Sequence, residues 1–173
     1  TRTIAQVVSD LRKGGTNAYP SLNPSTLLAK NSWEPSLEID GRKVAPLAGI
    51  SKATTVFCNE SGEFIVYESD RYGFNNSDKI WDAGEIDIAA LGDSFVHGMC
   101  VPREKNMPGV LAQKFPNTLN LGMSGNQSLL ELAILLEYLS VIKPKIVVWG
   151  FYENDLKYLQ NERQSPLLMR YLE

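Results

Sequence analysis

Three short apolar runs in the second half of the chain constrain its fold more than any other feature. The runs cover residues 86–91, 118–121 and 145–149, and stretches of helical character at 107–115 and 128–142 lie between them. Strands that alternate with helices form parallel sheets, because each helix carries the chain back to the edge at which the previous strand began. The sequence therefore predicts an α/β fold built on three parallel strands.

Each of the three runs ends in a polar turn that contains glycine. The turns are Gly92-Asp93-Ser94, Gly122-Met123-Ser124-Gly125-Asn126 and Gly150-Phe151-Tyr152-Glu153-Asn154-Asp155. Right-handed crossovers place the carboxyl ends of parallel strands on one edge of the sheet, where ligands bind in open α/β folds. We therefore predict a site at this edge, with Ser94 as the candidate nucleophile.

The first 85 residues have a different character. Helical spacing of apolar residues predicts a helix over Thr3–Lys13, and residues 16–35 predict an irregular connection with a short helix near Pro24. Asp40-Gly41 and the loop 59–62 each separate two β-prone runs, which predicts two antiparallel hairpins. We therefore predict two parts: a helix and β-hairpin extension over 1–85, and an α/β domain over 86–173.

Composition narrows the class of protein. The length of 173 residues suits one domain, and a net charge of −3 without long charged blocks gives no reason to expect nucleic-acid binding. The most apolar stretch, 129–142, is interrupted by Glu131 and Glu137 and falls short of the roughly 18–20 residues of a membrane helix. We expect a buried helix there and no transmembrane segment.

The two cysteines and the first residue bear on the compartment. Cys58 and Cys100 have no metal-binding spacing, and the sequence leaves open whether they pair or stay free. The chain starts at Thr1, which is consistent with a leader removed upstream, so an extracytoplasmic setting is our expectation.

The order of the three turns carries a family resemblance. Gly92-Asp93-Ser94, then Gly125 within the segment 120–126, then Asn154-Asp155, resemble the conserved blocks of the SGNH (GDSL-like) hydrolases, and Tyr72-Gly73-Phe74 resembles a segment of bacterial members. The resemblance covers about residues 70–160. It implies a three-layer, flavodoxin-like parallel sheet and a serine esterase that cleaves acyl or acetyl esters, including those on carbohydrates, without a metal or cofactor.

The resemblance also assigns roles to individual residues. Ser94 is the implied nucleophile, and the N–H groups of Ser94 and Gly125 with the side-chain amide of Asn154 are the implied oxyanion hole. Donors fixed in place before the negative charge develops are what a tetrahedral intermediate requires. Phe95 and Tyr152 are expected to line the substrate cleft, and the aromatic loop 67–74 is a further candidate for its wall.

Each of these residues also has a purely structural interpretation. A Gly-Asp-Ser turn caps helices, glycines such as Gly125 occur in ordinary turns, and Asn154 could cap a helix over 155–161. Asp93 and Asp155 are expected to orient loops through hydrogen bonds rather than to act in catalysis.

The chain departs from the family pattern in two places. Tyr152 stands where the third block commonly has glycine, and the Asp-x-x-His block that supplies the catalytic base is absent. A neutral serine hydroxyl needs an adjacent base. His97, the single histidine, follows Ser94 by three residues, and we expect it to line a pocket or pack a loop, with general base as the alternative.

The missing block leads to two hypotheses. Our expectation is that this chain is the amino-terminal portion of a longer hydrolase, that the Asp and His lie beyond Glu173, and that the two portions associate. The alternative is a non-catalytic carbohydrate-binding or assembly module on the same fold. An unrelated doubly wound ligand-binding domain is a third class, and no dinucleotide or P-loop pattern supports it.

Overall fold

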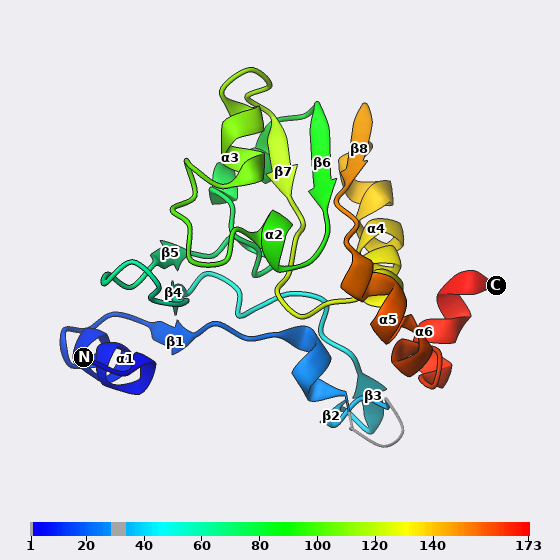
Figure 1. Ribbon diagram of the computed structural model, residues 1–173, viewed down its shortest axis with the longest axis horizontal. Coiled ribbons are helices and arrows are strands. Elements are labelled where there is room, and N and C mark those ends of the chain that lie inside the picture. The colour runs from blue at the N-terminus through cyan, green and yellow to red at the C-terminus, as the bar shows by residue number, and fades with distance from the viewer. Residues whose placement is uncertain (1, 29–33) are drawn as a thin grey trace.

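The computed structural model describes residues 2–28 and 34–173, and its centre is a parallel sheet of three strands in the order β7-β6-β8 (Figure 1). The strands are β6 (Ile88–Leu91), β7 (Thr118–Asn120) and β8 (Ile146–Trp149). Ile88 is in register with Thr118 on one side and with Ile146 on the other. The three strands therefore end on the same edge of the sheet, as the alternating pattern predicts.

Helices connect and flank these strands. They are α2 (Ser94–His97), α3 (Met107–Ala112), α4 (Ser128–Ile142), α5 (Glu153–Glu162) and α6 (Pro166–Met169), followed by the 3₁₀ turn η3 (Arg170–Leu172). α3 packs against β7, whereas α4 lies on the β8 side and packs against α5 and α6 (Figure 1). The bounds of α4 match the prediction, and α3 ends three residues earlier than expected.

The N-terminal part contains a second, mixed sheet in the order β1-β4-β5. The strands of this sheet are β1 (Ala18–Pro20), β4 (Thr54–Val56) and β5 (Val66–Glu68). The same part of the chain also contains the helix α1 (Ile4–Lys13) and the 3₁₀ turns η1 (Pro24–Leu27) and η2 (Asp78–Asp82). β4 and β5 form the predicted antiparallel pair, but β1 runs parallel to β4. The prediction of a wholly antiparallel N-terminal part is therefore wrong. Residues 29–33 of the predicted irregular connection lie outside the described residues.

The hairpin predicted around Asp40-Gly41 is also present. β2 (Leu37–Ile39) and β3 (Arg42–Val44) pair antiparallel across Asp40-Gly41. Asp40 has φ +50° and Gly41 has φ +72°, so both lie in the left-handed region that a tight two-residue hairpin turn requires.

The main core lies between the central sheet and its helices. Ala89 and Leu91 of β6, together with Leu119 and Ile134, are fully buried. β8 differs, because the exposed fractions of Ile146, Val147 and Trp149 are 52%, 39% and 38%. An apolar strand of this kind is ordinarily covered on both faces in a parallel sheet.

Several contacts join the parts on either side of residue 85, among them the hydrogen bonds between Asn76 and Asn120. Cys58 and Cys100 form a disulfide with a Cα–Cα distance of 5.2 Å, which settles the open question of their pairing. Tyr67 of β5 hydrogen bonds His97 of α2. The two sheets are thus tied together through the segment that follows β6.

Within residues 2–28 and 34–173, no helix combines the length and apolar character needed to span a bilayer.

Candidate functional site

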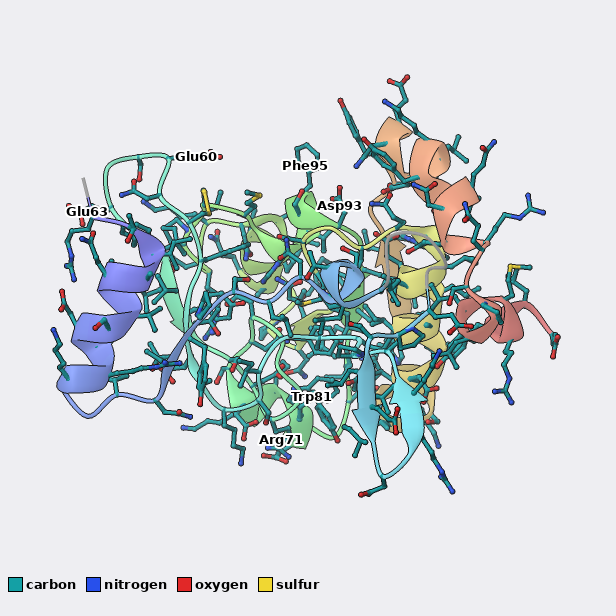
Figure 2. The ribbon with its side chains drawn as sticks, turned by 90° about the horizontal axis from the view of Figure 1, so that it is seen from below. Glu60, Glu63, Arg71, Trp81, Asp93 and Phe95 are labelled. Carbon is teal, nitrogen blue, oxygen red and sulfur yellow. A yellow bond between two sulfur atoms is a disulfide. The ribbon has the colours of Figure 1, made fainter. Side chains whose placement is uncertain are left out.

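The turn after β6 places Ser94 at the start of a one-turn helix. Asp93 is the N-cap of α2, and its Oδ1 accepts a hydrogen bond of 2.9 Å from the Phe95 N–H. Gly92 has φ +153°, and a Cβ there would lie 2.8 Å from the Gly150 carbonyl oxygen, so only glycine fits. Ser94 is half-buried, and Phe95 projects outward from the body of the molecule (Figure 2).

The turn after β7 packs directly on this helix. The Met123 N–H donates to the Gly92 carbonyl oxygen at 3.0 Å. A Cβ on Gly122 would lie 2.4 Å from the His97 backbone nitrogen, so the two segments approach more closely than a side chain permits. Gly125 follows with φ +81° and an exposed position beside Ser25 of η1.

The turn after β8 lies on the other side of β6. The Gly150 N–H donates to the Leu91 carbonyl oxygen at 2.7 Å. The N-cap of α5 is Tyr152, whose N–H donates to Asp155 Oδ2 at 2.6 Å. The structural alternative in which Asn154 caps this helix is therefore wrong. Asn154 is half-buried, and its Oδ1 is buried without a hydrogen-bond partner among the described residues.

An aromatic contact brings the first and third turns together. The rings of Phe95 and Tyr152 lie 5.3 Å apart between centroids, and the exposed fractions of the two side chains are 67% and 56%. These two predicted cleft residues therefore form one exposed aromatic surface. In the sequence, Phe95 directly follows Ser94, and Tyr152 precedes Asn154 by two residues.

The aromatic loop upstream of β6 does not reach this surface. Phe74 is fully buried in the core, and Tyr67 is buried against His97. The Asp70 carboxylate holds the loop by accepting the N–H groups of Tyr72 and Phe74. The side chain of Trp81, which donates to Asp70 Oδ2 at 2.8 Å, lies on the far side of the molecule from Phe95 (Figure 2). The expectation that this loop forms a cleft wall is wrong for Tyr67 and Phe74.

His97 is a buried structural residue in this fold. Its Nε2 lies 3.0 Å from the Tyr67 hydroxyl, and its Nδ1 lies 3.0 Å from both the N and the Oγ of Ser124. The ring also stacks on Phe57 with a centroid separation of 4.4 Å. Burial lowers the pKa of His97 to about 4. Loop packing, the role expected first for His97, agrees with these contacts, whereas the role of general base has no supporting contact.

Three buried carboxyl groups lie behind the β8 side of the site. Glu131 Oε2 accepts the Trp149 indole N–H at 2.6 Å, and burial raises the pKa of Glu131 to about 8. Glu162 accepts the Leu129 N–H at 2.7 Å, and burial raises its pKa to about 7. Burial also raises the pKa of Asp155. Burial thus makes the charged form of each of these carboxyls less favourable than it would be in water.

Sequence reasoning missed several residues that build this region. Tyr67 and Ser124 are the partners of His97, Glu162 accepts the Leu129 N–H at the start of α4, and Glu131 accepts the Trp149 indole N–H at the end of β8. Glu131 carried a signal, because it interrupts an otherwise apolar helix. Tyr67 carried none, since its contact with His97 joins residues 30 positions apart.

The described residues hold no group of three or more His, Cys, Asp and Glu side chains arranged to bind a metal ion. The chain matches no family model and no curated protein. The geometry of the three turns is therefore the basis for any functional conclusion.

Proposed function

We propose that this chain carries the nucleophile and oxyanion-binding turns of a serine ester hydrolase of the SGNH (GDSL-like) type, on a flavodoxin-like three-layer sheet. One observation carries the proposal. Ser94 begins a helix directly after the central strand, and the turns after β7 and β8 are hydrogen bonded to the two sides of that strand's end through Gly92 and Leu91.

The proposed reaction proceeds through an acyl-enzyme. Ser94 Oγ attacks the ester carbonyl carbon, and the hydroxyl proton passes to a base. The N–H groups of Ser94 and Gly125 and the Asn154 amide donate to the resulting oxyanion. Collapse expels the alcohol with a proton, and water then releases the acid by the same route. The base is a group other than His97, because both nitrogens of that ring are engaged elsewhere.

The exposed aromatic surface of Phe95 and Tyr152 supports an ester with an apolar or carbohydrate face as the substrate. Aromatic rings offer large contact area to both kinds of ligand. Acyl or acetyl esters on carbohydrates combine these features. The Cys58–Cys100 disulfide supports an oxidising, extracytoplasmic setting, because disulfides persist mainly there.

The second candidate is a non-catalytic carbohydrate-binding or assembly module. The observation that favours it is the position of His97, which is the single histidine of the chain and is fully buried. A module of this kind would retain the aromatic surface and bind carbohydrate without forming a covalent intermediate.

Acyl transfer to the protein separates the two candidates. The folded chain is treated with p-nitrophenyl acetate, with and without imidazole as an external base, and the acetylated residue is identified by mass spectrometry. We expect slow acetylation of Ser94 that imidazole accelerates and that Ser94→Ala abolishes. Ser128→Ala is the matched control, because Ser128 also begins a helix after a strand turn.

Two results would contradict the hydrolase. Acetylation that is unchanged in Ser94→Ala would show that the wrong serine has been chosen. A folded chain that binds oligosaccharide but never acetylates Ser94, with imidazole present, would favour the binding module.

A further inference from the structure

The buried ring of His97 connects the two segments that hold the proposed oxyanion donors. His97 ends the helix that Ser94 begins, and Ser124 directly precedes Gly125. The Ser124 backbone N–H donates to His97 Nδ1 at 3.0 Å. A single side chain therefore spans the gap between the nucleophile turn and the turn after β7.

The hydrogen-bond partners fix the protonation of this ring. A backbone N–H can only donate, so His97 Nδ1 accepts from Ser124 and carries no proton. The proton of the neutral imidazole then sits on Nε2, which donates to the Tyr67 hydroxyl at 3.0 Å. The assignment leaves the ring without a free lone pair for a serine proton.

The other end of His97 is held as well. Its carbonyl oxygen faces the side-chain amides of Asn75, Asn106 and Asn120 at 3.4–3.5 Å. Its backbone N–H donates to the Asp93 carbonyl oxygen at 2.9 Å. Groups from the loop after β5, from the start of α3 and from the end of β7 thus converge on a helix of one turn.

We propose that His97 is a positioning residue, which sets the Ser94 turn against the Gly125 turn by accepting the Ser124 N–H, and that it takes no part in proton transfer. The proposal rests on the proposed hydrolase function for its catalytic consequence, but the hydrogen bond itself is independent of that function. The contact of Gly122 with the His97 backbone supports it, because the two segments already pack without space for a Cβ.

Two conservative variants distinguish the role of His97 Nδ1 from that of His97 Nε2. In His97→Asn, the side-chain oxygen occupies the place of Nδ1 and retains an acceptor for the Ser124 N–H. In His97→Gln, the longer side chain places its amide near Nε2 and retains the partner of Tyr67 but not that of Ser124. Both variants lack an imidazole base.

The direct readout is hydrogen exchange of the Ser124 and Gly125 amides, measured at equal global stability. We expect exchange at Ser124 to be about tenfold faster or more in His97→Gln, because a buried N–H without a partner is strongly disfavoured. We expect a change of less than about threefold in His97→Asn, in which the acceptor is kept. Unchanged exchange in His97→Gln would overturn the proposal. A ¹⁵N spectrum of the wild-type ring with the proton on Nδ1 would overturn it as well.

Covalent labelling of Ser94 by a fluorophosphonate is the second readout. The proposal expects His97→Asn to keep most of the wild-type labelling rate and His97→Gln to lose about tenfold, in step with the exchange. Equal loss in both folded variants would indicate a base and overturn the positioning role. If the wild-type chain exchanges as expected but never labels, the positioning role is retained and the hydrolase function fails.

Discussion

The two sides of the central strand are built very differently. On the β7 side, Leu119 and Leu121 are fully buried, and His97, Ser124 and the asparagine amides form a continuous hydrogen-bonded network. On the β8 side, Ile146 and Trp149 are partly exposed, whereas buried polar atoms without a partner among the described residues occur on both sides, at Asn154 Oδ1 and Glu131 Oε1 and also at the side-chain amide of Asn126 after β7.

The contacts around the three turns differ accordingly. His97, in the helix that Ser94 begins, accepts the Ser124 N–H, so a hydrogen bond joins the turn of Ser94 to the turn of Gly125. Asn154 lies on the side where fewer contacts restrain it. We infer that the contact of His97 with Ser124 holds the turns of the proposed nucleophile Ser94 and the proposed oxyanion donor Gly125, whereas Oδ1 of the proposed donor Asn154 has no hydrogen bond among the described residues.

The largest expected effect comes from two matched glycines that follow the outer strands. In Gly122→Ala, the new Cβ meets the His97 backbone at 2.4 Å, which cannot move away. In Gly150→Ala, it meets the Val96 Cγ2 at 2.7 Å, which can shift with the side chain. We expect destabilisation of about 3 kcal/mol or more for Gly122→Ala and about 1–2 kcal/mol for Gly150→Ala in urea titrations. Equal losses would remove the asymmetry.

Loss of the disulfide, which joins the segment after β4 to the segment after α2, is expected to destabilise the fold by a comparable amount. Cys58 and Cys100 are 42 residues apart, and closure of a loop of that size stabilises the folded state by up to about 4 kcal/mol. We expect the double variant Cys58→Ser/Cys100→Ser to unfold at lower urea concentration and to expose Ser124 to faster hydrogen exchange. Preserved exchange at Ser124 would show that the His97 network holds without the disulfide.

The two sides should also respond to pH in opposite directions. In the folded chain the pKa of His97 lies at about 4, below its ordinary value of 6.5. The contribution of His97 to the free energy of unfolding is therefore present above pH 6.5 and is lost as pH falls toward 4. Tyr67 is the titratable group facing the ring, with Arg103 beyond it. In His97→Asn, the free energy of unfolding measured by urea titration should therefore fall less between pH 6.5 and pH 4 than it does in the wild type.

Glu131 is expected to change the free energy of unfolding on the alkaline side instead. In the folded chain the pKa of Glu131 lies at about 8, above its ordinary value of 4.5. The contribution of Glu131 to the free energy of unfolding is therefore full below pH 4.5 and is lost as pH rises through 8. Asp93, Asp155 and Glu162 are the acidic groups that act on it. We expect Glu131→Gln to reduce the loss of stability between pH 5 and 8, by at most about 1.4 kcal/mol per pH unit. An unchanged alkaline limb would contradict this assignment.

The smallest expected effect concerns the exposed aromatic surface. Phe95 and Tyr152 are more than half exposed, so Phe95→Ala and Tyr152→Ala should change the free energy of unfolding by less than about 1 kcal/mol. If these rings contact the substrate, each variant should raise KM several-fold for an aryl or carbohydrate ester and leave kcat nearly unchanged. Loss of kcat alone would place the rings in the positioning of Ser94 instead.

Much of this architecture follows from local patterns. The helix over 128–142, the tight turn at Asp40-Gly41 and the strand ends at Ser94, Gly125 and Asn154 depend on residues that are neighbours in the sequence, and those patterns predict them. β1 was missed because Pro20 and nearby turn-forming residues conceal a strand that only pairing with β4 stabilises.

Other features depend on contacts between distant residues. The Tyr67–His97–Ser124 chain, the Cys58–Cys100 pair and the exposure of β8 arise from how separate elements meet in space. Periodicity carries no information on such contacts. The apolar run at 146–149 predicts a strand correctly, but it does not reveal that half of Ile146 stays accessible to solvent.

Site-mapped fluorophosphonate labelling tests most directly whether Ser94 is a nucleophile held beside an oxyanion site. The folded chain is treated with the probe in the presence of imidazole, and the adduct is located by peptide mass spectrometry in wild type, Ser94→Ala and the control Ser128→Ala. We predict a single adduct on Ser94 in wild type and in Ser128→Ala, and none in Ser94→Ala. A folded wild-type chain without an adduct, or with one that persists in Ser94→Ala, would contradict this role of Ser94.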